Sequence, residues 1–163
     1  MTTPWTIRLA QARDVRELLR IEESQFPEPW TKSMLLDEVR NTTTRRYTVA
    51  VEEDRLVGYL GVMFVLDELH VNTIGTLRGE ESRGIASSLL DEAWIDARQR
   101  HIVRATLEVA VSNARAQRLY FRYGFHPVGV RKNYYERTRE DALVLWADLA
   151  PSSAPQAPPT LEP

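Results

Sequence analysis

The chain of 163 residues contains no cysteine. Without thiols it can form no disulfide framework, no thiolate nucleophile and no cysteine-based zinc or iron–sulfur site. Its three histidines, His70, His101 and His126, lack the close spacing of metal-binding histidines, so we expect no metal site. The sequence therefore excludes thiol chemistry and argues against metal chemistry.

Long apolar runs and a large excess of one charge are also missing. No stretch approaches the ~20 apolar residues of a membrane span, and Met1–Trp5 has neither the basic start nor the apolar core of a signal peptide. The balance of 21 Lys and Arg against 23 Asp and Glu gives a net charge of -2 and no broad case for nucleic-acid binding. We therefore predict a cytoplasmic protein that contacts neither nucleic acid nor membrane, as a monomer or weak dimer.

Proline is concentrated at the C-terminal end. Residues 151–163 hold five of the nine prolines and a single charged residue. Such a segment cannot bury enough apolar surface to pack, so we predict a disordered tail there. Residues 1–150 are long enough to build one domain with a substantial core.

Strand and helix periodicities alternate along residues 1–150. Strands are predicted at Trp5–Leu9, Tyr47–Val51, Leu56–Leu66, Leu69–Leu77, Ile102–Val109, Phe125–Val130 and Asp141–Leu149, the last two joined by a polar loop from Lys132 to Glu140. Helices are predicted from Asp14, from the N-cap Thr31 to Val39, from Gly84, and from the N-cap Asn113 to a left-handed Gly124. This order indicates an α/β (α+β) fold, with one mixed sheet flanked by about four helices.

The loop Arg78–Ala86 contains two glycines and leads into a predicted helix. Unpaired N–H groups and the helix dipole make such a junction suitable for binding an anion. Ser87 and Ser88 add hydroxyl groups in the first turn. A surface loop capped by Ser82, without a ligand, explains the same residues, and the loop alone does not decide between the two readings.

Two further residues could carry proton chemistry. Glu108 lies on the polar face of its predicted strand, opposite a face made of Val103, Ala105, Leu107 and Val109. Such a carboxylate can act as a general base, or it can be an exposed residue paired with Arg104. Tyr120 offers a phenol as a general acid, although its place in an apolar helical stripe also fits plain core packing.

Several short motifs occur together in a characteristic order. They are Phe26–Trp30, Leu66–Glu68, Gly84–Ala86 before Leu89–Leu90, Leu107–Val109, Ser112–Asn113, Leu119–Tyr120, Gly124–Phe125, Arg131–Tyr135 and Glu140–Ala142. With these motifs, nearly all of residues 5–149 resembles the GNAT family of N-acetyltransferases. Within that family the closest resemblance is to enzymes that acetylate the N-terminal alanine of ribosomal proteins.

The resemblance implies a mostly antiparallel sheet and direct transfer of acetyl from acetyl-CoA to a protein or peptide N-terminus, that of a ribosomal protein. It implies that Glu108 is the base and Tyr120 the acid. The residues that it implies for acetyl-CoA are Ile74, Gly75, Thr76 and Asn113 along the pantetheine arm, and Ser82, Arg83, Gly84, Ile85, Ala86 and Ser87 around the pyrophosphate. The segment Asn133–Tyr135 either shapes the peptide site or anchors a loop on the sheet.

Two positions depart from the family pattern. Glu81 stands where a donor or cation is usual, and a carboxylate repels a phosphate by about 1 kcal/mol at ~4 Å in bulk water. Arg78 or Arg83 could offset that charge. Ala110 stands where the subgroup often carries arginine. Acetylation of a small amine or a lysine therefore stays open, as does a CoA-binding module with weakened catalysis.

Overall fold

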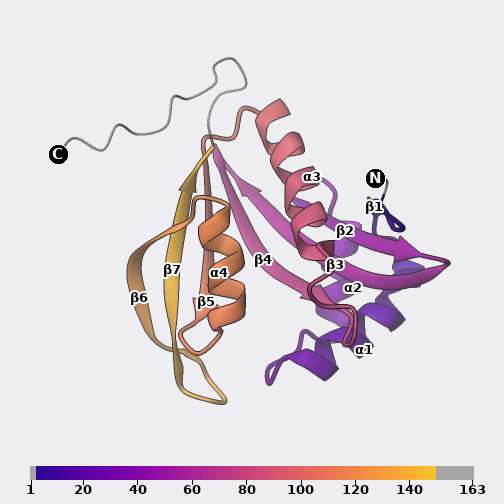
Figure 1. The fold of residues 1–163 in the computed structure, drawn as a ribbon, viewed down its shortest axis with the longest axis horizontal. Coiled ribbons are helices and arrows are strands. Elements are labelled where there is room, and N and C mark those ends of the chain that lie inside the picture. Colours follow the sequence, from indigo (N-terminus) through magenta and orange to yellow (C-terminus); the bar gives the residue numbers. More distant parts are fainter. Residues whose placement is uncertain (1–2, 150–163) are drawn as a thin grey trace.

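The computed structural model describes residues 3–149, which form seven strands and four α-helices (Figure 1). The strands are β1 (Thr6–Leu9), β2 (Arg45–Glu52), β3 (Arg55–Val65), β4 (Glu68–Thr76), β5 (Arg104–Ala110), β6 (His126–Tyr135) and β7 (Glu140–Asp148). The helices are α1 (Val15–Gln25), α2 (Lys32–Arg40), α3 (Ile85–Gln99) and α4 (Ala114–Arg122), with a short 3-10 turn at Ala12–Asp14. The tail predicted for residues 151–163 lies outside the described residues.

The strands form one sheet in the order β1-β2-β3-β4-β5-β7-β6. Among the described residues β4 and β5 are the one parallel pair, and all other neighbours run antiparallel. The helix α3 makes the crossover between these two parallel strands, as a parallel connection requires. The mixed, mostly antiparallel sheet and the four helices confirm the fold predicted from the sequence.

The helices cover both faces of the sheet, with α3 and α4 on one face and α1 and α2 on the other (Figure 1). One core packs the apolar stripe of α3, including Leu89 and Trp94, against strand residues such as Leu107. The second core packs Leu18 of α1 and Leu35 of α2 against the opposite face. The N-cap at Thr31 is as predicted, since its side chain accepts a hydrogen bond from the backbone N–H of Met34 at 3.2 Å.

The predicted polar loop from Lys132 to Glu140 is wrong over most of its length. Strand β6 continues to Tyr135 and β7 already begins at Glu140, which leaves a short turn between them. As the last strand of the sheet, β6 pairs only with β7, and nearly all its side chains are exposed. Polar residues are therefore tolerated in this strand, and a hydrophobic pattern cannot find its end.

Two apolar residues also lie elsewhere than expected. Leu66 is not part of β3 but sits in the following turn with a positive φ of 54°, where it is 95% exposed. Val103 precedes β5 and is 49% exposed, so it does not share the buried face of Ala105 and Leu107. Both residues lie in connections just outside a strand, so the alternation of strand side chains does not determine which way they face.

The strands β4 and β5 separate halfway along their length. Their pairing covers Glu68–Val71 and Arg104–Leu107 and then stops. At the same point the pairing of β4 with β3 shifts register, so that Asn72 is an extra residue between Val71 and Thr73. Such a bulge bends its strand, and Figure 1 shows β4 and β5 diverging from a shared end. The sheet therefore opens a gap between the far ends of two central strands.

A glycine near the end of β4 permits close packing beneath this gap. A Cβ atom on Gly75 would lie 2.5 Å from the hydroxyl of Tyr59, whose ring is fully buried. We expect Gly75→Ala to lower the free energy of unfolding by about 1–3 kcal/mol, because neither the strand nor the ring can move away without cost. Gly129→Ala is the matched control, since nothing lies within 4 Å of its Cβ position. Equal denaturant midpoints for the two variants would contradict this assignment.

Candidate active site

A cavity of about 510 Å³ occupies the gap between β4 and β5. Its walls come from the ends of both strands, the start of α4, the segment between α1 and α2, and the β6–β7 hairpin. Its polar or ionisable lining includes Glu22, Gln25, Glu28, Asn72, Thr73, Glu108, Ser112, Asn113, Tyr120, Tyr135, Thr138 and Glu140. The gap in the sheet thus brings together side chains that are distant in the sequence.

Glu108 is held at the wall of this cavity by two cationic or hydrogen-bonding partners. One carboxylate oxygen lies 2.7 Å from Nε2 of His70 on β4, and the other accepts a hydrogen bond from Nη1 of Arg131 on β6 at 3.2 Å. The hydrogen bond with His70, supported by Arg131, lowers the pKa of Glu108 although burial opposes it. The carboxylate is therefore ionised at neutral pH, as a base must be.

The alternative partner considered for Glu108 is wrong. Arg104 lies 3.5 Å from the carboxylate of Glu68, and its guanidinium stacks over the ring of Trp146 at 4.3 Å. Both His70 and Arg131 were missed by the sequence patterns, because nothing local indicates which residues of β4 and β6 face β5.

Tyr120 packs in the core and also reaches the cavity. The residue is only 5% exposed, and its ring meets Phe125 edge-on with 5.7 Å between centroids. Among the described residues no hydrogen-bond partner is found for its hydroxyl, which leaves the O–H able to donate into the cavity. Burial raises the pKa of Tyr120 above its usual value. Both predictions for this residue, core packing and an available phenol, are therefore compatible.

The junction between β4 and α3 has the geometry of an anion site. Gly84 caps α3 with a left-handed φ of 90°, and Ser82 also has a positive φ of 63°. The first N–H groups of a helix have no partner within it, which here concerns Ile85, Ala86 and Ser87. A Cβ on Gly84 would meet nothing within 4 Å, so the space beside this cap is open. A helix N-terminus of this kind can bind an anion.

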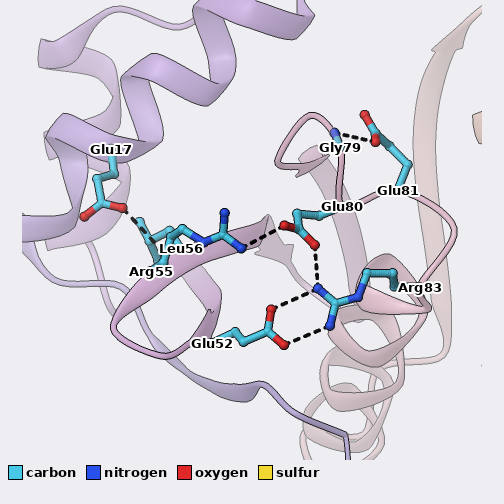
Figure 2. A network of polar contacts seen from close by, with 8 residues as sticks. All are labelled: Glu17, Glu52, Arg55, Leu56, Gly79, Glu80, Glu81 and Arg83. Atoms are coloured by element: carbon cyan, nitrogen blue, oxygen red, sulfur yellow. Dashed lines mark hydrogen bonds and ion pairs between the residues drawn. The ribbon is translucent and has the colours of Figure 1, made fainter.

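Arg83 is fixed by carboxylates on its own side of the loop. Figure 2 shows its guanidinium between Glu52, which it contacts through two bonds of 2.8 and 2.9 Å, and Glu80. Glu80 is also bonded to Arg55 at 2.7 Å, so the β2–β3 turn and the loop before α3 form one network. The side chain of Arg83 therefore holds the loop in place, and its part in any phosphate contact is limited to the backbone.

The unusual Glu81 is turned back on its own loop. Its carboxylate accepts a hydrogen bond from the backbone N–H of Gly79 at 2.7 Å (Figure 2). Neither arginine considered as its counter-charge contacts it, because Arg83 is paired with Glu52 and Glu80, and Arg78 donates to the carbonyl of Ser24 at 2.7 Å. The carboxylate thus closes a turn in the loop.

A cation that the sequence patterns missed reaches the loop from another helix. Nη2 of Arg115, in the first turn of α4, donates to the hydroxyl oxygen of Ser82 at 3.0 Å. Arg115 is exposed, and no carboxylate pairs with it among the described residues. It therefore supplies positive charge beside the N-terminus of α3.

The other predicted residues lie on both sides of the gap. Ile74 and Asn113 line the cavity, and the Asn113 side chain caps α4 by accepting from the N–H of Ala116 at 3.2 Å. Gly75 and Thr76 follow Ile74 at the end of β4 but do not line the cavity, and the Thr76 carbonyl accepts from Gln25. The residues from Ser82 to Ser87 do not line the cavity and lie at the start of α3, so the residues predicted to be catalytic and those predicted to bind the anion occupy separate regions.

Two loops meet over the cavity. The backbone N–H of Arg137, in the β6–β7 turn, donates to a carboxylate oxygen of Glu28, and Nη1 of the same arginine donates to the carbonyl of Pro27 at 2.6 Å. Pro27 and Glu28 belong to the Pro-rich break between α1 and α2, and they line the cavity together with Thr138 of the turn. A bridge of hydrogen bonds therefore joins two loops at the wall of the cavity.

A buried carboxylate forms the floor below that bridge. Glu22 of α1 is 1% exposed and accepts hydrogen bonds from Tyr59, from Thr73 at 3.3 Å and from the backbone N–H of Trp30 at 3.2 Å. Burial raises its pKa above the usual range, against the effect of these bonds. Glu22 thereby ties α1 to the sheet and to the segment that follows the helix.

Within residues 3–149 no helix is both long and apolar enough to cross a membrane. The same residues contain no group of three or more His, Cys, Asp or Glu arranged to hold a metal ion.

Comparison with known proteins identifies the family. Residues 15–125 match the model of the acetyltransferase (GNAT) family. A relative from Bacillus subtilis, named as a candidate ribosomal protein bS18 alanine N-acetyltransferase, is 32% identical over 149 residues, which are 91% of this chain and 99% of its own.

Two solved structures share the fold. The ribosomal-protein-S18-alanine N-acetyltransferase of Escherichia coli superposes with a TM-score of 0.82 at 23% identity, covering 97% of this chain and 99% of its own. The PaiA N-acetyltransferase of Thermoplasma acidophilum in complex with coenzyme A has a TM-score of 0.74 at 15% identity, covering 90% and 99%. The family match spans most of the domain, and the chain belongs to the acetyltransferase (GNAT) family.

Proposed function

We propose that this acetyltransferase moves the acetyl group of acetyl-CoA directly to the N-terminal α-amine of a protein, that of ribosomal protein bS18 or a similar chain. The observation that carries this proposal is the cavity in which an ionised Glu108 and the unpaired hydroxyl of Tyr120 occur together. The names of the relatives from B. subtilis and E. coli support the acceptor. An acceptor of this kind also implies work in the cytoplasm.

Acetyl-CoA would bind across two regions, the start of α3 and the cavity between β4 and β5. The backbone N–H groups at the start of α3, with Ser82 and Ser87, would hold the diphosphate, and Arg115 would add a cation. Ile74 to Thr76 and Asn113 would line the pantetheine arm, between that loop and the cavity. When bound, acetyl-CoA supplies an already activated thioester, so the protein needs to provide only alignment and control of two protons.

Glu108 would take the first proton. An α-ammonium group has an unperturbed pKa of about 8, so its deprotonation is a modest task for a positioned carboxylate. A proton leaves the ammonium nitrogen for Glu108, directly or through a water, and the freed nitrogen lone pair forms the new bond to the acetyl carbon. Tyr120 would give its hydroxyl proton to the sulfur as the C–S bond breaks. The second proton that the nitrogen loses on becoming an amide would restore the phenol. Because burial raises the pKa of this phenol, it is protonated when it is needed.

The bridge between Arg137 and the α1–α2 segment supports a chain end as the acceptor. The bridge joins two loops at the cavity wall, and four carboxylates line the cavity, from Glu22, Glu28, Glu108 and Glu140. A free N-terminus has a positively charged amine that such carboxylates attract. Main chain leaves an N-terminus in one direction only, whereas it leaves an internal lysine in two directions, and the bridge leaves less room for the second segment.

The acceptor is tested with a panel of matched peptides. We expect mass spectrometry to detect acetyl transfer to a peptide with a free α-amine and an N-terminal alanine, and none to the same peptide with a blocked α-amine and an internal lysine. Small amines such as spermidine serve as a third arm. Transfer to lysine or to the small amine at equal kcat/KM would replace the proposed function by the alternative acceptors.

Removal of either proton-transferring group should slow turnover in a folded protein. We expect Glu108→Gln and Tyr120→Phe each to lower kcat by about 100-fold or more, the usual contribution of a general base or acid. Acetyl-CoA affinity, measured by calorimetry, should change little in either variant. Full activity in both variants would show that these residues are not the base and the acid.

Arg115 is tested by binding rather than by turnover. We expect Arg115→Ala to weaken acetyl-CoA binding on the order of tenfold, because it removes a charge-assisted hydrogen bond to a phosphate. Arg118→Ala is the matched control, since Arg118 lies on the same helix and is also exposed. The loss should shrink as salt is added. Equal affinities for the two variants would remove Arg115 from the phosphate site.

A further inference from the structure

His70 faces the proposed base from a neighbouring strand. Parallel pairing places His70 of β4 opposite Thr106 of β5, two residues before Glu108. The ring nitrogen Nε2 lies 2.7 Å from Oε2 of Glu108, and the His70 side chain is 27% exposed. An ionised carboxylate can only accept hydrogen bonds. The proton of this short contact therefore lies on Nε2 of His70.

We propose that His70 is a positioning residue for acetyl transfer, whose Nε2–H fixes the carboxylate of Glu108 toward the acceptor amine. The proposal rests on the proposed function, since it assigns a role relative to the base. With Oε2 held by His70 and Oε1 by Arg131, the carboxylate cannot rotate, yet each oxygen keeps a lone pair for the incoming ammonium. The base is thus aligned before the acceptor arrives.

The charge of His70 also affects this base. A neutral imidazole donates one proton from Nε2, whereas an imidazolium adds a full positive charge beside Glu108. That charge would make the carboxylate a weaker base and would repel an ammonium acceptor. The donor N–H of His70 and its possible charge are therefore tested separately.

Two substitutions separate the hydrogen bond from the charge. His70→Gln keeps an N–H donor of similar reach but cannot be protonated, whereas His70→Leu removes both properties. We expect His70→Leu to lower kcat for peptide acetylation about tenfold, with acetyl-CoA affinity unchanged. His70→Gln should keep most of kcat, because the amide N–H can replace the donor that His70 presents to Glu108.

His126→Gln is the matched control, because His126 is exposed on β6 and has no contact with Glu108. This variant should keep the kcat of the parent. The proposal is overturned if His70→Leu also keeps it, or if His70→Gln loses as much kcat as His70→Leu.

A measurement without turnover keeps this test independent of the proposed function. The hydrogen bond with His70 is the largest cause of the lowered pKa of Glu108. Carboxyl carbon NMR of the free protein should therefore show the pKa of Glu108 rising in His70→Leu and not in His126→Gln. An unchanged Glu108 titration overturns the role of His70. Absence of peptide acetylation by the parent protein, with this shift observed, contradicts only the proposed function.

Discussion

The separation of β4 and β5 is the constraint on which the rest of the site depends. Seven strands in one sheet would normally leave no opening between two central neighbours. Here the extra residue Asn72 ends the pairing after Val71 and Leu107, and the strand ends turn apart. The ends then expose both backbone and side chains to a shared cavity. A regular β4 would pair along its whole length and close the site.

The charged side chains beside this gap mostly pair with one another. In the loop before α3, acidic and basic side chains mostly satisfy one another, with Arg83 held by Glu52 and Glu80 and with Glu81 bonded to Gly79. In the proposed function, backbone N–H groups would therefore be the main attraction for phosphate. Such groups are fixed by the helix, and they keep their direction whatever side chains surround them. The acid at position 81 is therefore compatible with the family's acetyl-CoA chemistry.

The catalytic region has the opposite character, because it is assembled from side chains of many elements. Glu108 depends on His70 from β4 and Arg131 from β6, while Tyr120 is brought in by α4. The bridge from Arg137 to Pro27 and Glu28 then limits what can enter. Each of these contacts joins residues that are far apart in the chain. The arrangement proposed for catalysis thus depends on the same packing that stabilises the domain.

The sequence by itself determined the local features of this protein. Periodicity found the seven strands and four helices, Thr31 and Asn113 were identified as caps, and motif order identified the family. These features depend on neighbours within a few residues. The end of β6 was not predicted, because an edge strand at the surface needs no apolar pattern.

Only the tertiary structure decided the partners of the site residues. Register across a parallel pair selected His70 for Glu108, and the packing of α4 beside α3 selected Arg115 for Ser82. Likewise, Arg83 was available to phosphate in the sequence and is bound by carboxylates in the fold. The type of a side chain determines which interactions it can make. Which of them it does make depends on distances, and these are fixed only when strands and helices from distant parts of the chain pack together.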